Sequence, residues 1–269
     1  MKSDLDQLLR DHHADAIWVT GPGQHNPAMV YLTGGGHMTR ADVIKPAGQP
    51  MLLCHAPMER DEAAKTGLTT LNYNEYPIKE RLAEAEGDRL TAEALLYEKI
   101  FLRLGLTEGT VLLYGRTDAG KHYAIVQKLQ QMLPGLSFVG DLDDAVLLQA
   151  MATKDAAEIE RIRAMGRVVI EVVSRTADLL TSHQKKDEIL IREDGAPLTV
   201  GDVKGQINLW LAELGAENPE DTIFAIGADA GVPHSSGNPT DPLRLGQTIV
   251  FDIFPCEKGG GYFYDFTRT

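Results

Sequence analysis

The stretch 252-DIFPCEKGGGYFYDFTRT-269 carries two aspartates, Asp252 and Asp265, in apolar runs on either side of a glycine-rich segment. Both runs contain the aromatic and β-branched residues typical of strands, and three consecutive glycines suit a loop that needs positive φ. The pattern therefore predicts a β-hairpin. Pairing about positions 258 and 259 would place Asp252 directly opposite Asp265 on one sheet face, with Cβ atoms about 4.5–5.5 Å apart.

Two carboxylates at that separation repel each other, and burial strengthens the repulsion. Three arrangements would compensate: a proton shared by the two acids, a nearby cation such as Arg268, or a divalent metal ion, which prefers oxygen ligands. A fourth interpretation places both acids at exposed strand ends without any role. A β-bulge would also change the pairing. The spacing alone leaves these alternatives open.

Composition limits the classes of protein to consider. The 269 residues are 43% hydrophobic, which is enough for two domains of ordinary size. The formal net charge of −13 disfavours a nucleic-acid partner, because an acidic surface repels phosphates. Two cysteines are too few for a disulfide framework, and no apolar run is long enough for a signal peptide or a membrane span. We therefore expect a cytoplasmic protein without a membrane partner.

The first part of the chain alternates between strand-like and helix-like patterns. A helix is expected before residue 16, and further helices over 88–106 and 119–133. The expected strands are 16–20, 29–35 and 110–115, together with a strand–turn–strand unit over 41–54. Strands that alternate with helices predict an α/β domain, which we place at residues 1–150.

The pattern changes at residue 153. Asp155 followed by Glu158 is typical of a capping box, and apolar residues at three- and four-residue steps predict a long amphipathic helix over 153–182. A second helix is expected over 199–215, followed by strands at 222–227, 248–254 and 262–267. These elements predict a second domain over residues 151–269.

The terminal segments 246-GQTIVFDIF-254 and 261-GYFYDFTRT-269 resemble the metal-binding hairpin of the M24 metallopeptidases, the pita-bread family of methionine aminopeptidase, aminopeptidase P and prolidase. Other parts of the chain agree with this resemblance. They are the opening catalytic helix at 153–169, the loop with a histidine after a proline at 226–247, and the YLTG element of the creatinase/prolidase N-terminal domain at 29–35. The resemblance covers nearly the whole chain and points to the Xaa-Pro aminopeptidase and dipeptidase (prolidase) branch.

This resemblance implies a fold, a site and a reaction. The fold is α/β (α+β): a creatinase/prolidase-type N-terminal α/β domain followed by an incomplete pita-bread catalytic domain. Asp252 matches the first metal ligand, Asp265 the second, and His234 the histidine that contacts substrate. Two divalent ions (Mn, Co or Zn) would activate a water that hydrolyses N-terminal peptide bonds, above all Xaa-Pro bonds. A peptide substrate and a homodimer are also implied.

The family completes its metal site with a histidine and two glutamates beyond the second aspartate, whereas the sequence given ends at Thr269. We therefore expect the chain to be a fragment that is inactive alone. The spacing between Asp252 and Asp265 is also longer than is usual in the family. Without the resemblance, His234 would be interpreted as a solvated loop histidine. Two alternatives remain: a non-catalytic binding protein with the pita-bread fold, and a metal-free creatinase-like amidinohydrolase. Bound metal in the complete protein would separate the peptidase from both.

Overall fold

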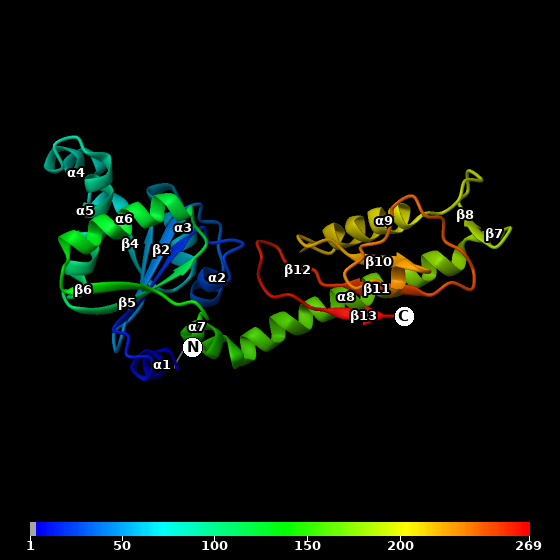
Figure 1. Ribbon diagram of the computed structural model, residues 1–269, viewed down its shortest axis with the longest axis horizontal. Helices are drawn as coiled ribbons and strands as arrows, with labels where there is room; N and C mark the ends of the chain where they lie inside the picture. Colours follow the sequence, from blue (N-terminus) through cyan, green and yellow to red (C-terminus); the bar gives the residue numbers. More distant parts are fainter. Residues whose placement is uncertain (1–3) are drawn as a thin grey trace. The chain divides into compact units, whose positions relative to one another are not determined.

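The computed structural model describes residues 4–269, which form two compact units that meet between Lys154 and Asp155 (Figure 1). The boundary predicted from the sequence, between residues 150 and 151, lies within α7 (Ala145–Ala152), the last helix of the first unit. Both units combine helices with β-structure, which confirms the mixed α/β class. Among the described residues, no helix combines the length and the apolar character that a membrane span requires.

The first unit is built on a six-stranded sheet in the order β4-β3-β2-β1-β5-β6. Its central strand β1 pairs antiparallel with β2 and parallel with β5, so the sheet is mixed. The strands are β1 (Ala16–Gly21), β2 (Ala41–Pro46), β3 (Leu52–His55), β4 (Thr69–Asn72), β5 (Gly109–Gly115) and β6 (Leu136–Gly140).

Alternation along β1 divides the interior into two cores. Ile17 and Val19 pack in one core and Trp18 in the other, because successive side chains of a strand point to opposite faces. The first core is covered by α1 (Leu5–Asp11), α2 (Pro27–Thr33), α3 (Arg60–Lys65) and α7. The second is covered by α5 (Arg89–Arg103) and α6 (Ala119–Met132), and the unit also contains η1 (Pro57–Glu59), η2 (Tyr73–Glu75) and α4 (Ile78–Glu84). Helices therefore cover both faces of the sheet.

The predicted strand over 29–35 is wrong, because this segment forms most of helix α2. The Asn26 side chain accepts a hydrogen bond from the Met29 N–H, which caps the first turn, and a proline occupies the first helical position. Gly34, at φ +84°, ends the helix in the left-handed conformation. The local preference of the apolar run for a strand gives way to these end signals and to burial of the helix in the first core.

The second unit packs two helices against an antiparallel three-stranded sheet in the order β10-β11-β13. The helix α8 (Ala156–Ser182) begins with the predicted capping box of Asp155 and Glu158, and α9 (Val200–Glu213) begins with another. The remaining elements are β7 (Gln184–Lys186), β8 (Ile189–Ile191), β9 (Ala216–Glu217), β10 (Ile223–Ile226), η3 (Asp229–Gly231), β11 (Ile249–Ile253), β12 (Cys256–Glu257) and β13 (Phe266–Arg268).

Alternation along β11 separates the core of this unit from the acidic face of its sheet. Phe251 and Ile253 are buried in the core that the helices cover. Their neighbour Asp252 is half-buried on the opposite face, because side chains alternate along a strand. Phe224 of β10 is fully buried and packs edge-to-face on Phe251, with ring centroids 5.4 Å apart. This aromatic pair therefore fixes the strand that carries Asp252.

Replacing Phe224 by Ala should destabilise the second unit by about 3–5 kcal/mol, because it removes a large buried ring and leaves a cavity. Native-state hydrogen exchange of the amides in β10 and β11 would measure this loss. Leu209→Ala is the matched control, because Leu209 on α9 is 60% exposed, and it should change the free energy of opening by less than about 0.5 kcal/mol. Equal effects of the two substitutions would contradict this description of the core.

Candidate functional site

The hairpin forms, but its register differs from the predicted one. Asp252 lies opposite Thr267 rather than Asp265, so the predicted pairing is wrong by two residues. The chain turns through Gly259 and Gly260, which have φ angles of 85° and 75°. Since the shift is an even number of residues, both acids stay on one face of the sheet. Asp252 and Asp265 therefore become diagonal neighbours.

The two aspartates interact electrostatically. Partial burial, repulsion from the Asp252 carboxylate and a hydrogen bond between the two groups raise the pKa of Asp265 above its ordinary value. The Thr267 hydroxyl donates a hydrogen bond of 2.6 Å to Asp252 Oδ1, which orients that carboxylate. The pair therefore favours either a proton or a cation between its oxygens.

Arg268, the cation considered from the sequence, makes other contacts. Its guanidinium lies over the Phe266 ring, 3.9 Å from the centroid, and its Nη1 donates a hydrogen bond of 3.0 Å to the Thr267 carbonyl. Over residues 4–269, no ion pair joins it to either aspartate. The geometry therefore favours the shared proton or the metal ion over Arg268 as the compensating group.

The start of α8 holds the hairpin loop in place. Glu257, at the end of the short strand β12, accepts hydrogen bonds from Arg161 Nη2 at 2.6 Å and from the Tyr262 N–H at 2.9 Å. The Arg161 guanidinium also lies 4.8 Å from the centroid of the Tyr262 ring. The Tyr262 hydroxyl in turn donates to Glu158, the acid of the capping box. Helix α8 thus fixes the loop between the two aspartates.

Helix α8 and the hairpin also approach closely farther along the helix. A Cβ added to Gly166 would lie 2.8 Å from the Tyr264 ring, which is too close for an ordinary contact. The site predicted from the sequence did not include Arg161, Glu257, Tyr262 or Gly166. Two features of the sequence could have indicated this contact. One is a charged residue beside the glycines of the predicted hairpin, and the other is a glycine within a long amphipathic helix.

His234 lies on the loop that joins β10 to β11, where it is exposed. Its φ of 61° falls in the left-handed region, which is uncommon for a residue other than glycine and is enriched at functional sites. Among the described residues, no hydrogen bond or ion pair joins His234 to Asp252 or Asp265. The role of His234 in contacting substrate stays a prediction.

The donor chemistry of the aspartate pair suits a divalent metal ion. Carboxylate oxygens are hard ligands, and the repulsion from Asp252, which contributes with burial to the raised pKa of Asp265, is the kind that a bound cation relieves. Within residues 4–269, however, no three His, Cys, Asp or Glu side chains gather closely enough to hold a metal. Asp252 and Asp265 therefore fit as part of a metal site, and further ligands must come from groups outside this pair.

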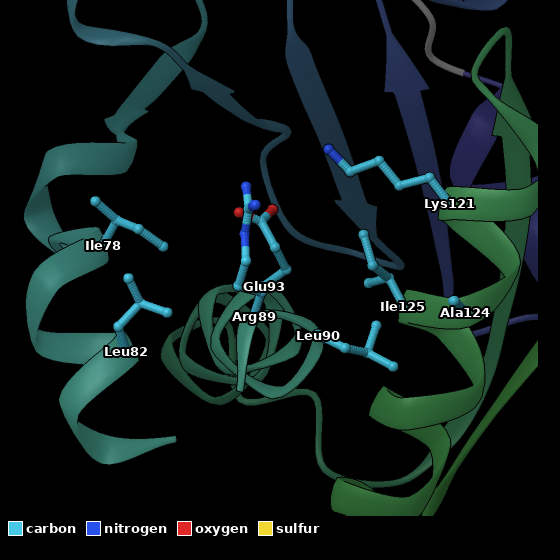
Figure 2. Close-up of a pocket in the computed structure, with 8 residues that line it drawn as sticks. All are labelled: Ile78, Leu82, Arg89, Leu90, Glu93, Lys121, Ala124 and Ile125. Carbon is cyan, nitrogen blue, oxygen red and sulfur yellow. The ribbon is translucent and has the colours of Figure 1, made fainter. Parts of the chain in front are cut away.

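A cavity of about 460 Å³ lies in the first unit, between α4, α5 and α6 (Figure 2). Its apolar lining comes from all three helices: Ile78, Leu82, Leu90, Ala124 and Ile125. The charged groups Arg89, Glu93 and Lys121 lie along the same cavity. It belongs to a different unit from the aspartate pair, and its lining lacks the carboxylate cluster of a metal site.

Comparisons with known proteins agree with this fold. No protein-family profile matches the chain, and no curated protein matches its sequence. Among solved structures, prolidase from Pyrococcus furiosus matches with a TM-score of 0.66 and 18% identity, over 100% of this chain and 69% of that one. X-Pro aminopeptidase from Thermotoga maritima matches with a TM-score of 0.68 and 19% identity, over 97% and 64%. A dipeptidase from Pyrococcus horikoshii matches with a TM-score of 0.67 and 20% identity, over 100% and 64%.

The chain therefore has the α/β fold shared by solved prolidases, X-Pro aminopeptidases and dipeptidases, which confirms the fold that the terminal hairpin predicted. It spans between 64% and 69% of the length of these three structures. Identities of 18–20% establish the fold, whereas the activity has to be argued from the residues of the hairpin.

Replacing Asp265 by Asn should raise the melting temperature at pH 7, because it removes the repulsion between the two carboxylates. A raised folded-state pKa means that stability falls as pH rises from the ordinary Asp value through the folded one. The gain should therefore be present at neutral pH and disappear below about pH 3.8. Since Asp265 is exposed, the gain should not exceed about 2–4 °C.

Calorimetric scans at pH 7 and pH 3 would measure this difference. Glu193→Gln, which removes one exposed carboxylate from the same unit, is the control and should show no such pH-dependent gain. A gain of the same size at both pH values would show that the two aspartates do not repel each other.

Proposed function

We propose that this chain is part of a metal-dependent peptidase that hydrolyses N-terminal peptide bonds, with Xaa-Pro peptides as substrates. The observation that carries the proposal is the pair of carboxylates, Asp252 and Asp265, on the sheet face opposite the helix-covered core. The fold is shared with structures described as prolidase and X-Pro aminopeptidase. Because the chain spans about two-thirds of their length, the activity and a homodimeric state are proposed for the whole protein.

Asp252 and Asp265 would hold the divalent ions, for which Mn, Co and Zn are the candidates. When bound, such ions lower the pKa of a water molecule and polarise a peptide carbonyl. The hydrogen bond from Thr267 fixes the orientation of the Asp252 carboxylate, so that its second oxygen is presented in one direction. Asp265 must lose its proton before it can bind a cation, and its raised pKa makes binding weaker at acid pH.

His234 would act on the substrate. An imidazole N–H on an exposed loop can donate a hydrogen bond to the carbonyl oxygen that becomes negative during hydrolysis. The left-handed backbone at this position restricts the direction of the side chain. The proposed division of roles is therefore that the two aspartates bind metal and His234 orients or stabilises the substrate.

A non-catalytic binding protein remains the second candidate, because the described residues gather no third metal ligand. A metal-free amidinohydrolase is less consistent with the site. An adjacent carboxylate pair with a raised pKa has little use in a site without either a cation or a shared proton. Metal binding therefore separates the proposed function from both alternatives.

Titration of the protein with Mn²⁺ should show binding that is weakened at least about tenfold by Asp252→Asn or Asp265→Asn, because each removes an anionic ligand. Thr267→Val should weaken binding less, since Thr267 orients a ligand without being one. Isothermal titration calorimetry would measure affinities, and Glu193→Gln should leave them unchanged. Equal affinity in the wild type and both Asn variants would exclude the hairpin as a metal site.

Replacing His234 by Ala in the complete gene product should lower kcat for Xaa-Pro hydrolysis by about 10²–10³-fold, the usual effect of removing one donor to a developing oxyanion. Mn²⁺ affinity and melting temperature should stay at wild-type values, because the histidine is exposed and lies on a loop. Steady-state assays with Mn²⁺ present would test this. Retention of full kcat would remove His234 from the site without affecting the metal assignment.

A further inference from the structure

The first unit contains another cavity, of about 300 Å³, at the carboxyl ends of β1 and β5. Three of its lining residues are permanently cationic, Arg40, Arg116 and Lys121, whereas Asp118 is the one acid among them. The chain as a whole has the opposite balance, with 39 acidic and 26 basic residues. A basic cavity on an acidic protein is a local feature that overall composition does not explain.

The two arginines are held in place by their neighbours. Arg40 Nη2 donates to Glu93 Oε2 at 2.9 Å and to the Tyr97 hydroxyl at 3.3 Å. Arg116 Nη1 donates to the His25 carbonyl at 3.0 Å. Each guanidinium has five N–H donors, so both retain donors beyond these contacts. The half-buried Arg40 guanidinium is therefore oriented before any ligand arrives, which reduces the entropy lost on binding, whereas the exposed Arg116 is held by one hydrogen bond.

Lys121 belongs to the first turn of α6, a helix of 14 residues. The Asp118 carboxylate is engaged in capping this helix, because it accepts the backbone N–H of Lys121 at 2.8 Å. Glu93 is likewise engaged with Arg40. Asp118 of the lining and Glu93 beside it are thus fewer than the three cations, so the net charge of the group is positive. Thr117 and Tyr97 contribute hydroxyl groups to the same lining.

We propose that this cavity binds a small oxyanion, namely a carboxylate or phosphate group, between Arg116 and Lys121 with Arg40 alongside. Guanidinium and ammonium groups bind both kinds of oxyanion through charge-assisted hydrogen bonds. The neighbouring apolar cavity shares Lys121 and Ile125 with this one, and Figure 2 shows Lys121 above Ile125 at its edge. The site lies in the first unit and is independent of the aspartate pair and of the proposed peptidase activity.

Trp18 offers a reporter for binding. The centroid of its ring lies 4.6 Å from that of the Tyr97 ring and 5.0 Å from that of the His122 ring, and both neighbours line the cavity. In a Trp210→Phe background, Trp18 is the one remaining tryptophan of the chain. Sodium phosphate and sodium acetate would be titrated at constant ionic strength, with sodium chloride as the control for screening. Calorimetry on the same samples would detect binding that leaves the fluorescence unchanged.

At least one of phosphate and acetate should bind saturably, and the tighter of the two identifies the source of the oxyanion. Arg116→Gln and Lys121→Gln should each weaken that binding at least about tenfold, the usual effect of losing a charged hydrogen-bond partner. Lys128→Gln, on the same helix but outside the cavity lining, should change affinity by less than about twofold. Absence of saturable binding by both methods, or equal weakening by Lys128→Gln, would overturn the proposal.

Discussion

The position of both aspartates depends on the ion pair between Arg161 on α8 and Glu257 of β12, in the segment that joins β11 to β13. Their closest atoms, Nη2 and Oε2, are 2.6 Å apart, and Arg161 Nε also donates to the same carboxylate. Burial opposes ionisation of Glu257, but the hydrogen bonds from Arg161 and from the Tyr262 N–H, together with the positive charge of Arg161, outweigh it and lower the pKa of Glu257. A two-point contact of this kind fixes direction as well as distance. The loop therefore cannot slide along the helix without breaking it.

Through this contact, a residue of helix α8 affects which side chains lie together on the sheet. Glu257 receives the Tyr262 N–H, so the same carboxylate that binds the helix also closes the turn. With the turn fixed, the pairing of β11 with β13 is fixed, and Thr267 rather than Asp265 falls opposite Asp252. Thr267 then hydrogen-bonds to Asp252 and leaves Asp265 to approach diagonally. An interaction on one side of the hairpin thus determines which groups meet on the acidic face.

The sequence predicts the long helices better than it predicts the register of the hairpin. It also predicts correctly that both aspartates lie on one face of the sheet. Helix α8 is recognised from its capping box, Asp155 and Glu158, and from the spacing of its apolar residues. Both features depend on residues close together in the chain, so they can be predicted directly from the sequence. The register depends on the contact between Arg161 and Glu257, which are far apart in sequence. Helix α2 was missed for a different, local reason, since its buried apolar run resembles a strand unless the end signals are weighed. The role of His234 rests on the resemblance to a known family, because no periodic pattern in the sequence predicts where a loop places its side chains.

The exposure of the acidic face explains how the second unit can fold with two carboxylates side by side. Water screens their repulsion at the surface, so the cost is modest compared with the burial of Phe224, Phe251 and Ile253 on the other face. We therefore expect this unit to fold without a cation, in contrast to small domains whose core is a metal site. A metal ion would instead bind to a hairpin that Arg161 and Glu257 have already shaped. Substitutions of the aspartates should accordingly alter binding while the surrounding sheet and helices keep their structure.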